Sequence, residues 1–222
     1  DGTLAKVDDV ITITITAADD ENIQTPTITI AGNAATIATG TNGEPTFTAT
    51  YQMQSSDATS DAIAFTVDFL DLAGNAGDQQ IDLINDSDDG VSFDKQAPSF
   101  TIISIGALGN DVSTATTDDD HTRAMSGDEI TVSLTSDEIL KTGLDPTVTI
   151  AGNTATVTRT STTRYSAVYE MASSDVGLNN ASITLNISSY ADSSGNTGDD
   201  VTATLDGSDV IFDMTAPVLG TV

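Results

Sequence analysis

The residues of this chain best suited to chemistry are its carboxylates. Aspartate and glutamate together number 34, against 6 lysines and arginines, which gives a formal net charge of −28. The acidic residues gather in short runs at residues 8–9, 19–21, 86–89, 118–120, 128–129 and 137–138. Between them lie stretches of threonine and aliphatic residues that are almost free of acids. Because Ca²⁺ takes about six to eight oxygen ligands from carboxylates, carbonyls and asparagine, these runs are candidate calcium loops.

The same acidity has a second interpretation that needs no metal, in which the loops are simply solvated. Two carboxylates about 4 Å apart near a protein surface repel by about 4 kcal/mol, so either bound cations or a saline environment is favoured. The negative charge also disfavours nucleic acids and anionic membrane surfaces as partners. No stretch approaches the roughly 18 consecutive apolar residues of a membrane span, so membrane insertion of this segment is not expected.

Catalytic sequence patterns are missing. His121 is the single histidine, it stands in a polar acidic stretch, and the chain has no cysteine. A Ser-His-acid triad would need this histidine together with a nucleophile elbow such as G-x-S-x-G, which does not occur. Without cysteine, disulfides and thiolate metal sites are excluded. Paired carboxylates of the glycosidase type are unspecific in so acidic a chain. We therefore expect that the protein is not an enzyme.

The chain contains an internal repeat. Several blocks recur in the same order at spacings of 118 to 121 residues. The recurring blocks are Ile-Ala-Gly-Asn at 30–33 and 150–153, Tyr-x-Met-x-Ser-Ser-Asp at 51–57 and 169–175, Gly-Asn at 74–75 and 195–196, and Phe-Asp-x-x-Ala-Pro at 93–98 and 212–217. Ordered recurrence of this kind indicates a tandem duplication.

Within each copy, the hydrophobic pattern predicts β-strands. Ile11, Ile13 and Ile15 alternate with threonines, and this period of two is typical of a strand with one buried face. Tight hairpins with positive φ are predicted at Gly32-Asn33 and Gly152-Asn153. Further strands are predicted at residues 27–31, 47–53, 62–70 and 91–94, and at 100–105, 130–134, 147–151, 155–160, 165–171, 182–188, 201–205 and 210–213. The predicted fold is all-β, as two tandem Ig-like Greek-key β-sandwiches.

The repeat divides the chain into predicted modules at residues 1–97 and 98–217, followed by the start of a further module at 218–222. The predicted strand at 100–105 has no counterpart in the first copy, so that module lacks its first strand. Either the chain begins inside a module, or a neighbouring segment supplies the open edge, which otherwise favours strand addition. A head-to-tail array needs an odd number of traversals, so residues 155–160, or the pair 201–205 and 210–213, should be partial or bent.

An ordered set of motifs resembles known repeats. The motifs are Leu-Ala-Lys-Val-Asp-Asp at 4–9, Ile-Ala-Gly-Asn at 30–33, Asp-Leu-Ala-Gly-Asn at 71–75 and Phe-Asp-Lys-Gln-Ala-Pro at 93–98. Together they resemble the bacterial and archaeal Ig-like (BIg-type) repeats of giant surface adhesins and surface-layer proteins. The resemblance implies a secreted stalk or coat, often with calcium bound between domains. The second copy departs from the pattern with Asp-Ser-Ser-Gly-Asn at 192–196.

Alternating strand directions assign the candidate ligands to the ends of the modules. The loops after the second and sixth strands of a module lie at the end where it begins, and in the second copy they carry Glu138 and Asp192. The linker brings Asp94 to that same end. The full set of predicted calcium ligands is Asp94, Glu138, Asp192, Asn196, Asp8, Asp9, Asp57, Asp71, Asn75 and Asp213. We therefore expect Ca²⁺ at or near the junction of the modules.

These observations predict a structural, extracellular segment of a cell-surface protein. Its partners would be neighbouring modules of the same chain, or copies of itself in a lattice, and calcium would stiffen the array. The alternative is an adhesin module that binds a carbohydrate or a receptor, which usually requires exposed aromatic residues. The chain has only four tyrosines and six phenylalanines. Tyr190 is the one predicted to be exposed. A polysaccharide-active enzyme is a more distant third interpretation.

Overall fold

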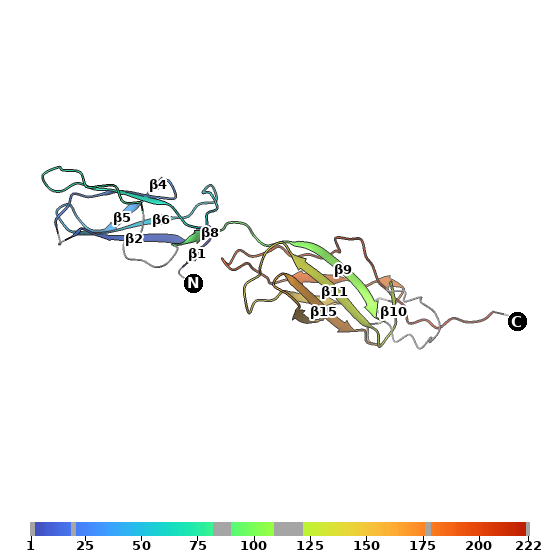
Figure 1. Ribbon diagram of the computed structural model, residues 1–222. Helices are drawn as coiled ribbons and strands as arrows, with labels where there is room; N and C mark the ends of the chain where they lie inside the picture. The colour runs from blue at the N-terminus through green and yellow to red at the C-terminus, as the bar shows by residue number, and fades with distance from the viewer. Residues whose placement is uncertain (1–2, 19–20, 82–89, 109–121, 176–178, 221–222) are drawn as a thin grey trace. The chain divides into compact units, whose positions relative to one another are not determined.

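The computed structural model describes residues 3–18, 21–81, 90–108, 122–175 and 179–220 (Figure 1). The chain is all-β, with 46% of the described residues in β-structure that forms several sheets, as in a β-sandwich. Among the described residues, no helix is long and apolar enough to cross a membrane. The contacts divide the chain into two compact units, Asp1–Gln96 (unit 1) and Ala97–Val222 (unit 2).

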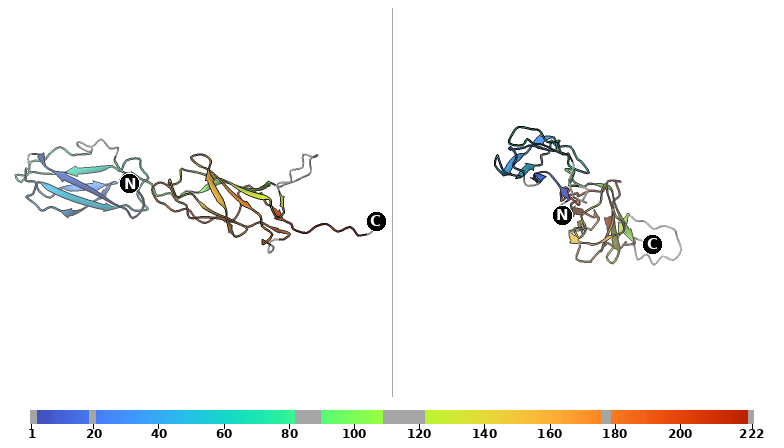
Figure 2. Two further views of the ribbon diagram at one scale, coloured as in Figure 1. Left: turned by 90° about the horizontal axis from the view of Figure 1, so that it is seen from below. Right: turned by 60° about the vertical axis from the view of Figure 1, so that its left-hand side comes forward.

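Unit 1 has two three-stranded sheets, in the orders β2-β6-β5 and β4-β3-β7, and a short parallel pair β1-β8. Figure 2 shows from two further sides that the longer strands of this unit run along its length. Its strands are β1 (Leu4–Ala5), β2 (Val10–Thr16), β3 (Thr27–Ile30), β4 (Asn33–Ala34), β5 (Thr36–Thr39), β6 (Thr46–Gln52), β7 (Phe65–Asp68) and β8 (Ser92–Phe93).

Unit 2 repeats this plan with one additional long strand, β9, which extends the larger sheet to the order β14-β15-β11-β9. Its other sheets have the orders β13-β12-β17 and β10-β18-β16. Its strands are β9 (Phe100–Leu108), β10 (Arg123–Ala124), β11 (Glu129–Ser136), β12 (Thr147–Ile150), β13 (Asn153–Thr154), β14 (Thr156–Arg159), β15 (Arg164–Glu170), β16 (Ala181–Ser182), β17 (Leu185–Ser188) and β18 (Ile211–Phe212).

The core of unit 2 lies between these sheets. Ile130, Val132 and Leu134 alternate along β11 with more exposed residues and are fully buried or nearly so. They belong to one continuous cluster with Ile103 of β9 and Ile150 of β12. The alternation follows from the period of two in a strand, which directs every second side chain to the same face.

The core of unit 1 is smaller. It has two buried clusters, one of Ile28, Ile30, Ala49 and Val67 and one of Ala5, Met53 and Phe93, while the isoleucines of β2 are only partly buried. Among the described residues β2 is paired on one side only, and a strand paired on one side leaves part of its inward row uncovered.

Each unit contains the same tight hairpin. Ala31 and Gly32 connect β3 to β4 with φ angles of 51° and 77°, and the corresponding Ala151 and Gly152 have 54° and 77°. Positive φ at both central residues is typical of a type I′ turn, in which glycine avoids the steric penalty of a side chain. The predicted position was wrong by one residue, because Asn33 already belongs to β4 and uses its side-chain amide to bond the carbonyl of Ala31 at 3.0 Å.

Two other strand predictions for unit 2 need correction. Residues 201–205 do not form a regular strand. Val201 makes an isolated bridge with Ile187, and the segment then crosses to β9, where the Leu205 N–H donates to the Ile103 carbonyl. The predicted strand at 182–188 is two strands, because β16 pairs with β18 whereas β17 pairs with β12. A change of partner sheet inside one hydrophobic run is invisible to periodicity.

Candidate metal centre

Two acidic residues predicted as calcium ligands lie together in unit 2. A carboxylate oxygen of Glu138 and one of Asp192 lie within 4.8 Å of each other. Glu138 is in the loop after β11, and Asp192 is in the loop after β17. An antiparallel bridge between Leu140 and Asp192 joins these two loops, and the Lys141 N–H donates to the Ala191 carbonyl at 2.9 Å. The backbone therefore fixes the spacing of the two carboxylates.

Asp192 is only 1% exposed, and its carboxylate is held by its own loop. One oxygen accepts hydrogen bonds from the N–H groups of Gly195 at 2.6 Å and Asn196 at 2.8 Å. The other accepts the side-chain amide of Asn196 at 2.7 Å. A carboxylate offers about four acceptor positions, so these three donors leave it capacity to bind a cation. Because the amide nitrogen of Asn196 faces Asp192, its carbonyl oxygen is the atom that this residue can offer to a metal.

The donor set in these two loops fits a hard cation. Glu138 and Asp192 offer carboxylate oxygens and Asn196 offers an amide oxygen, which are the ligands that Ca²⁺ prefers. Thiolate ligands, which would favour zinc or copper, do not exist in a chain without cysteine, and this group contains only oxygen ligands. Since two carboxylates this close repel each other, a bound cation would relieve that repulsion.

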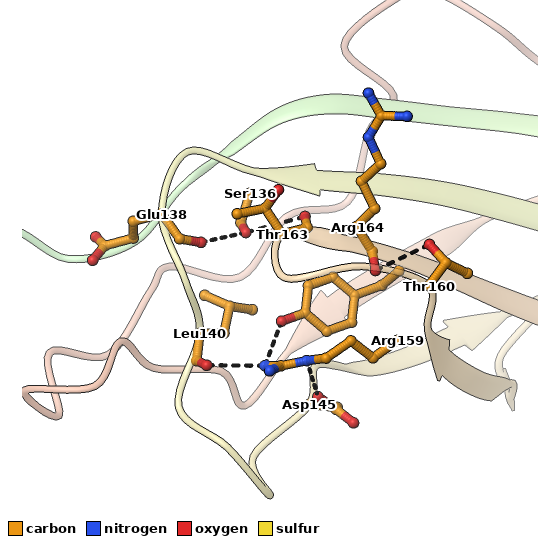
Figure 3. A network of polar contacts seen from close by, with 9 residues as sticks. Ser136, Glu138, Leu140, Asp145, Arg159, Thr160, Thr163 and Arg164 are labelled. Carbon is orange, nitrogen blue, oxygen red and sulfur yellow. Dashed lines mark hydrogen bonds and ion pairs between the residues drawn. The ribbon is translucent and has the colours of Figure 1, made fainter.

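A separate network holds the loop of Glu138 against the larger sheet (Figure 3). Arg159 of β14 donates through one terminal nitrogen to the Leu140 carbonyl at 2.9 Å and to the Tyr165 hydroxyl at 2.7 Å. Its Nε lies 3.2 Å from a carboxylate oxygen of Asp145, which makes an ion pair without hydrogen-bond geometry. The hydroxyl of Ser136 bonds the Glu138 carbonyl at the start of the same loop. Both ends of the loop that carries Glu138 are therefore anchored.

Asp94 and Asp213 take equivalent positions, directly after the last strand of each unit. The Asp94 N–H donates to the Ala5 carbonyl at 2.9 Å, and the Asp213 N–H donates to the Ala124 carbonyl at 2.8 Å. Each carboxylate accepts the backbone N–H two residues further on, at 2.9 Å in unit 1 and 2.8 Å in unit 2. These aspartates therefore shape the segment that leaves each unit.

Asp71 and Asn75 of unit 1 repeat the arrangement of Asp192 and Asn196. The backbone and side-chain amides of Asn75 donate to the two oxygens of Asp71 at 2.8 and 2.6 Å. The hydrogen bond from the Asn75 side chain, and after it the bond from the Asn75 backbone N–H, hold the pKa of the Asp71 carboxyl below its ordinary value. The loop of Asp71 and that of Asp192 therefore offer the same kind of ligand.

Glu21 is a further candidate calcium ligand. It belongs to the acidic run at 19–21 but was not among the predicted ligands. The bridge between Ile23 and Asp71 matches the bridge between Leu140 and Asp192. Glu21 therefore corresponds to Glu138, because each precedes its bridging residue by two positions. The shared spacing Glu-x-Ile and Glu-x-Leu was a signal in the sequence, but the run of acids around Glu21 concealed it.

Asp57 has a structural role. It is 6% exposed, and its carboxylate accepts hydrogen bonds from the Asn33 amide at 3.0 Å, the Gln54 N–H at 2.8 Å and the Tyr51 hydroxyl at 3.0 Å. Asp175 of unit 2 has the same partners in kind, from Asn153, Ala172 and Tyr169. These contacts tie the hairpin turn to the end of the long strand. We therefore assign Asp57 to the fold instead of to a metal.

The two tyrosines that donate hydrogen bonds to these aspartates have raised pKa values. Burial raises the pKa of Tyr51. The adjacent Asp57 carboxylate raises this pKa further, because it accepts a hydrogen bond from the protonated phenol and would repel a negatively charged phenolate. Burial followed by Asp175 raises the pKa of Tyr169 in the same way. The repetition of both effects indicates that the two units share this contact.

Asp8 and Asp9 also have a structural role, because they shape the turn before β2. The Asp9 carboxylate accepts the Lys6 N–H at 2.9 Å, as Asp128 accepts the N–H of Met125 in unit 2 at 2.8 Å. Asp8 has a φ of 75° at the position where unit 2 has a glycine. Aspartate tolerates the left-handed region better than most residues, which accounts for its presence here without a metal.

Tyr190 is not the exposed aromatic residue that the sequence predicted. It is 1% exposed, its ring centroid lies 4.8 Å from that of Phe100, and its hydroxyl donates to the Asp199 carbonyl at 2.7 Å. Gly198 makes this burial possible, because a Cβ at that position would lie 2.0 Å from the Tyr190 ring. The ligand-binding interpretation thereby loses the aromatic side chain on which it depended.

Several predicted features lie outside the described residues. They are His121 and the acidic residues at 19–20, 86–89 and 118–120.

No protein-family model matches this chain, and no curated protein sequence matches it. The function proposed next therefore rests on the contacts of the chain itself.

Proposed function

We propose that this chain is a structural, non-catalytic segment of an extracellular cell-surface protein, either an adhesin stalk or a surface layer. In this proposal the two units are tandem Ig-like Greek-key sandwiches, and Ca²⁺ stiffens their junction. The observation that carries the proposal is that the carboxylates of Glu138 and Asp192 lie close together. The backbone bridge between Leu140 and Asp192 joins their two loops.

Repetition supports a structural role over a catalytic one. The Asp-Asn loop, the aspartate that bonds the hairpin asparagine and a tyrosine, and the aspartate after the last strand occur in both units with the same kinds of hydrogen bond. A catalytic constellation does not need to recur in every module, whereas a contact between successive modules does. The formal charge of −28 also suits a surface exposed to a cation-rich medium.

In this proposal the linker completes the calcium site. Ser99 is fixed at one end of unit 2, because its N–H and hydroxyl donate to the Asp137 carboxylate at 2.8 and 2.7 Å. Asp94 precedes Ser99 by five residues. Five residues span at most about 17 Å, so the chain permits Asp94 to approach the loop that begins at Asp137. In this proposal a cation bound by both the linker and unit 2 stiffens the chain, and the fixed φ of Pro98 reduces the backbone freedom of the adjoining segment.

The expected stabilisation is modest. Extracellular calcium modules have dissociation constants of order 10⁻⁴ to 10⁻³ M. At about 5 mM Ca²⁺, binding to the folded state alone contributes about 1 to 2 kcal/mol. For a unit of this size, that corresponds to a rise of about 3 to 10 °C in Tm.

Thermal unfolding in Ca²⁺ and in EDTA tests the proposal. The wild-type chain should unfold about 3 to 10 °C higher in Ca²⁺, and Glu138→Gln should lose most of this difference because a ligand charge is gone. Glu170→Gln is the matched control, since it makes the same charge change on an exposed residue of β15 and should retain the calcium effect. Equal Tm values for the wild type in the two media, or an equal calcium effect in both variants, would contradict the proposal.

A further inference from the structure

Strand β2 of unit 1 forms an open sheet edge. Within the described part of the chain it pairs with β6 alone, whereas its counterpart β11 in unit 2 pairs with β15 on one side and β9 on the other. The β2–β6 register is regular over all seven residues from Val10 to Thr16. Unit 1 therefore presents the edge that β9 occupies in unit 2.

The hydrogen bonds at both ends of β2 define which groups face this edge. The Met53 N–H donates to the Asp9 carbonyl, and the Ala17 N–H donates to the Pro45 carbonyl, each at 2.8 Å. Since hydrogen-bonded pairs alternate in an antiparallel ladder, the odd-numbered residues of β2 bond to β6. The N–H and C=O groups of Val10, Thr12, Thr14 and Thr16 consequently point to the open side.

Unit 2 shows the same pattern with the edge filled. The Met171 N–H donates to the Asp128 carbonyl and the Ser136 N–H donates to the Thr163 carbonyl, so the even-numbered residues of β11 bond to β15. The intervening residues at 129, 131, 133 and 135 lie opposite residues of β9. They are the counterparts of the four open residues in β2.

The side chains beside the open edge are apolar and incompletely covered. Ile11, Ile13 and Ile15 are partly buried, whereas the corresponding residues of β11 are at most 1% exposed. In unit 2, residues 103, 105 and 107 of β9 lie opposite these positions and are themselves buried. Open backbone groups next to an uncovered apolar row are the two components of a strand-acceptor site.

The edge also lacks the usual protection against pairing. Natural edge strands are commonly blunted by proline, lysine, an inward charge or a bulge. The sequence Val-Ile-Thr-Ile-Thr-Ile-Thr of β2 contains none of these residues, and its register shows no shift. Among the described residues, this strongly β-forming strand of seven residues therefore has a regular edge without a partner strand.

We infer that the free edge of β2 is a binding site for an extended segment with the residue pattern of β9. The segment adds antiparallel to β2 and places positions equivalent to Ile103, Ile105 and Ala107 opposite Ile15, Ile13 and Ile11. The backbone bonds supply affinity, and the alternate apolar side chains supply selectivity. This site is independent of calcium and of the carboxylates of unit 2.

Binding of a synthetic peptide with the sequence of residues 99–108 tests the inference on the full chain. Fluorescence anisotropy of the labelled peptide should show saturable binding. Hydrogen exchange should slow at the amides of Thr12 and Thr14, because their N–H groups gain acceptors only when a strand is added. No saturable binding, or binding without protection of these two amides, would overturn the inference.

Two matched pairs locate the site. Thr14→Pro removes an N–H on the open side, which an edge strand tolerates, and should weaken binding by about tenfold or more, while Thr14→Val should bind like the wild type. In the peptide, N-methylation at positions 104 and 106 should abolish binding, whereas N-methylation at 103 and 105 should not, because those N–H groups face away from β2. The peptide pair keeps the test valid should Thr14→Pro fail to fold.

Other occupants give different results. Equal binding to the wild type and a folded Thr14→Pro variant would mean that the peptide exchanges with β9 in unit 2, and would refute the site on β2. Dimers of the chain that Thr14→Pro dissociates and that exclude the peptide would assign the edge to a second copy, and would also overturn the inference as stated.

Discussion

Replacing Asp57 with alanine is expected to lower the free energy of unfolding of unit 1 by about 3 to 5 kcal/mol. The substitution removes the acceptor of the Tyr51 hydroxyl and the Gln54 N–H and one of the two acceptors of the Asn33 amide, in a partly buried setting. Each buried donor that loses its partner costs about 1 to 3 kcal/mol. Calorimetry should show that the transition of unit 1 moves to lower temperature while that of unit 2 stays in place.

The duplication provides the controls for this prediction. Asp175→Ala should have the corresponding effect on unit 2 alone, since the contacts of Asp175 repeat those of Asp57. Asp61→Ala removes an exposed carboxylate nearby and should leave both transitions nearly unchanged. A Tm of Asp57→Ala that matches the Tm of Asp61→Ala would show that Asp57 does not hold the hairpin turn in place.

Arg159→Met is expected to destabilise unit 2 by about 2 to 3 kcal/mol. It removes the donor to the Leu140 carbonyl and the Tyr165 hydroxyl, although methionine retains much of the apolar stem. The guanidinium carbon also lies 5.1 Å from the Tyr165 ring centroid, so a cation–π contact is lost. Urea unfolding followed by circular dichroism measures the change in the free energy of unfolding.

Unit 1 suggests how the Arg159 contact can be separated from its partner. At the position of Tyr165 unit 1 has Phe47, and its strand β5 contains no arginine, so unit 1 lacks the guanidinium and the phenol together. The double variant Arg159→Met, Tyr165→Phe should therefore be less destabilised than the sum of the two single variants. Strict additivity would contradict the coupling between these side chains.

The sequence predicted the strands well where the whole hydrophobic run belongs to one sheet. The alternation of Ile11, Ile13 and Ile15 defines β2, and the all-β architecture is confirmed. Periodicity alone wrongly predicted a regular strand at residues 201–205, because it does not reveal that the chain leaves one strand and crosses to another, whereas the odd number of traversals had allowed this pair of strands to be partial. It also placed the hairpin turn one residue late, because Ala31 adopts the left-handed conformation in place of the more permissive Asn33.

The candidate site was predictable in part. Strand alternation correctly brought Glu138 and Asp192 into neighbouring loops of unit 2. The sequence did not distinguish these two residues from carboxylates that stabilise turns. Asp57 and Asp9 accept hydrogen bonds from donors that come together only in the folded chain. It misjudged Tyr190 for a similar reason, since the space for its ring depends on the absence of a side chain at Gly198.

Small-angle scattering of the full chain in Ca²⁺ and then in EDTA tests the central claim most directly. If Ca²⁺ stiffens the chain as proposed, the wild type should show a narrower distribution of interatomic distances in Ca²⁺ than in EDTA. Removal of calcium, or the substitution Glu138→Gln, should broaden this distribution. Scattering curves that are identical in Ca²⁺ and in EDTA would contradict the claim that calcium stiffens this chain.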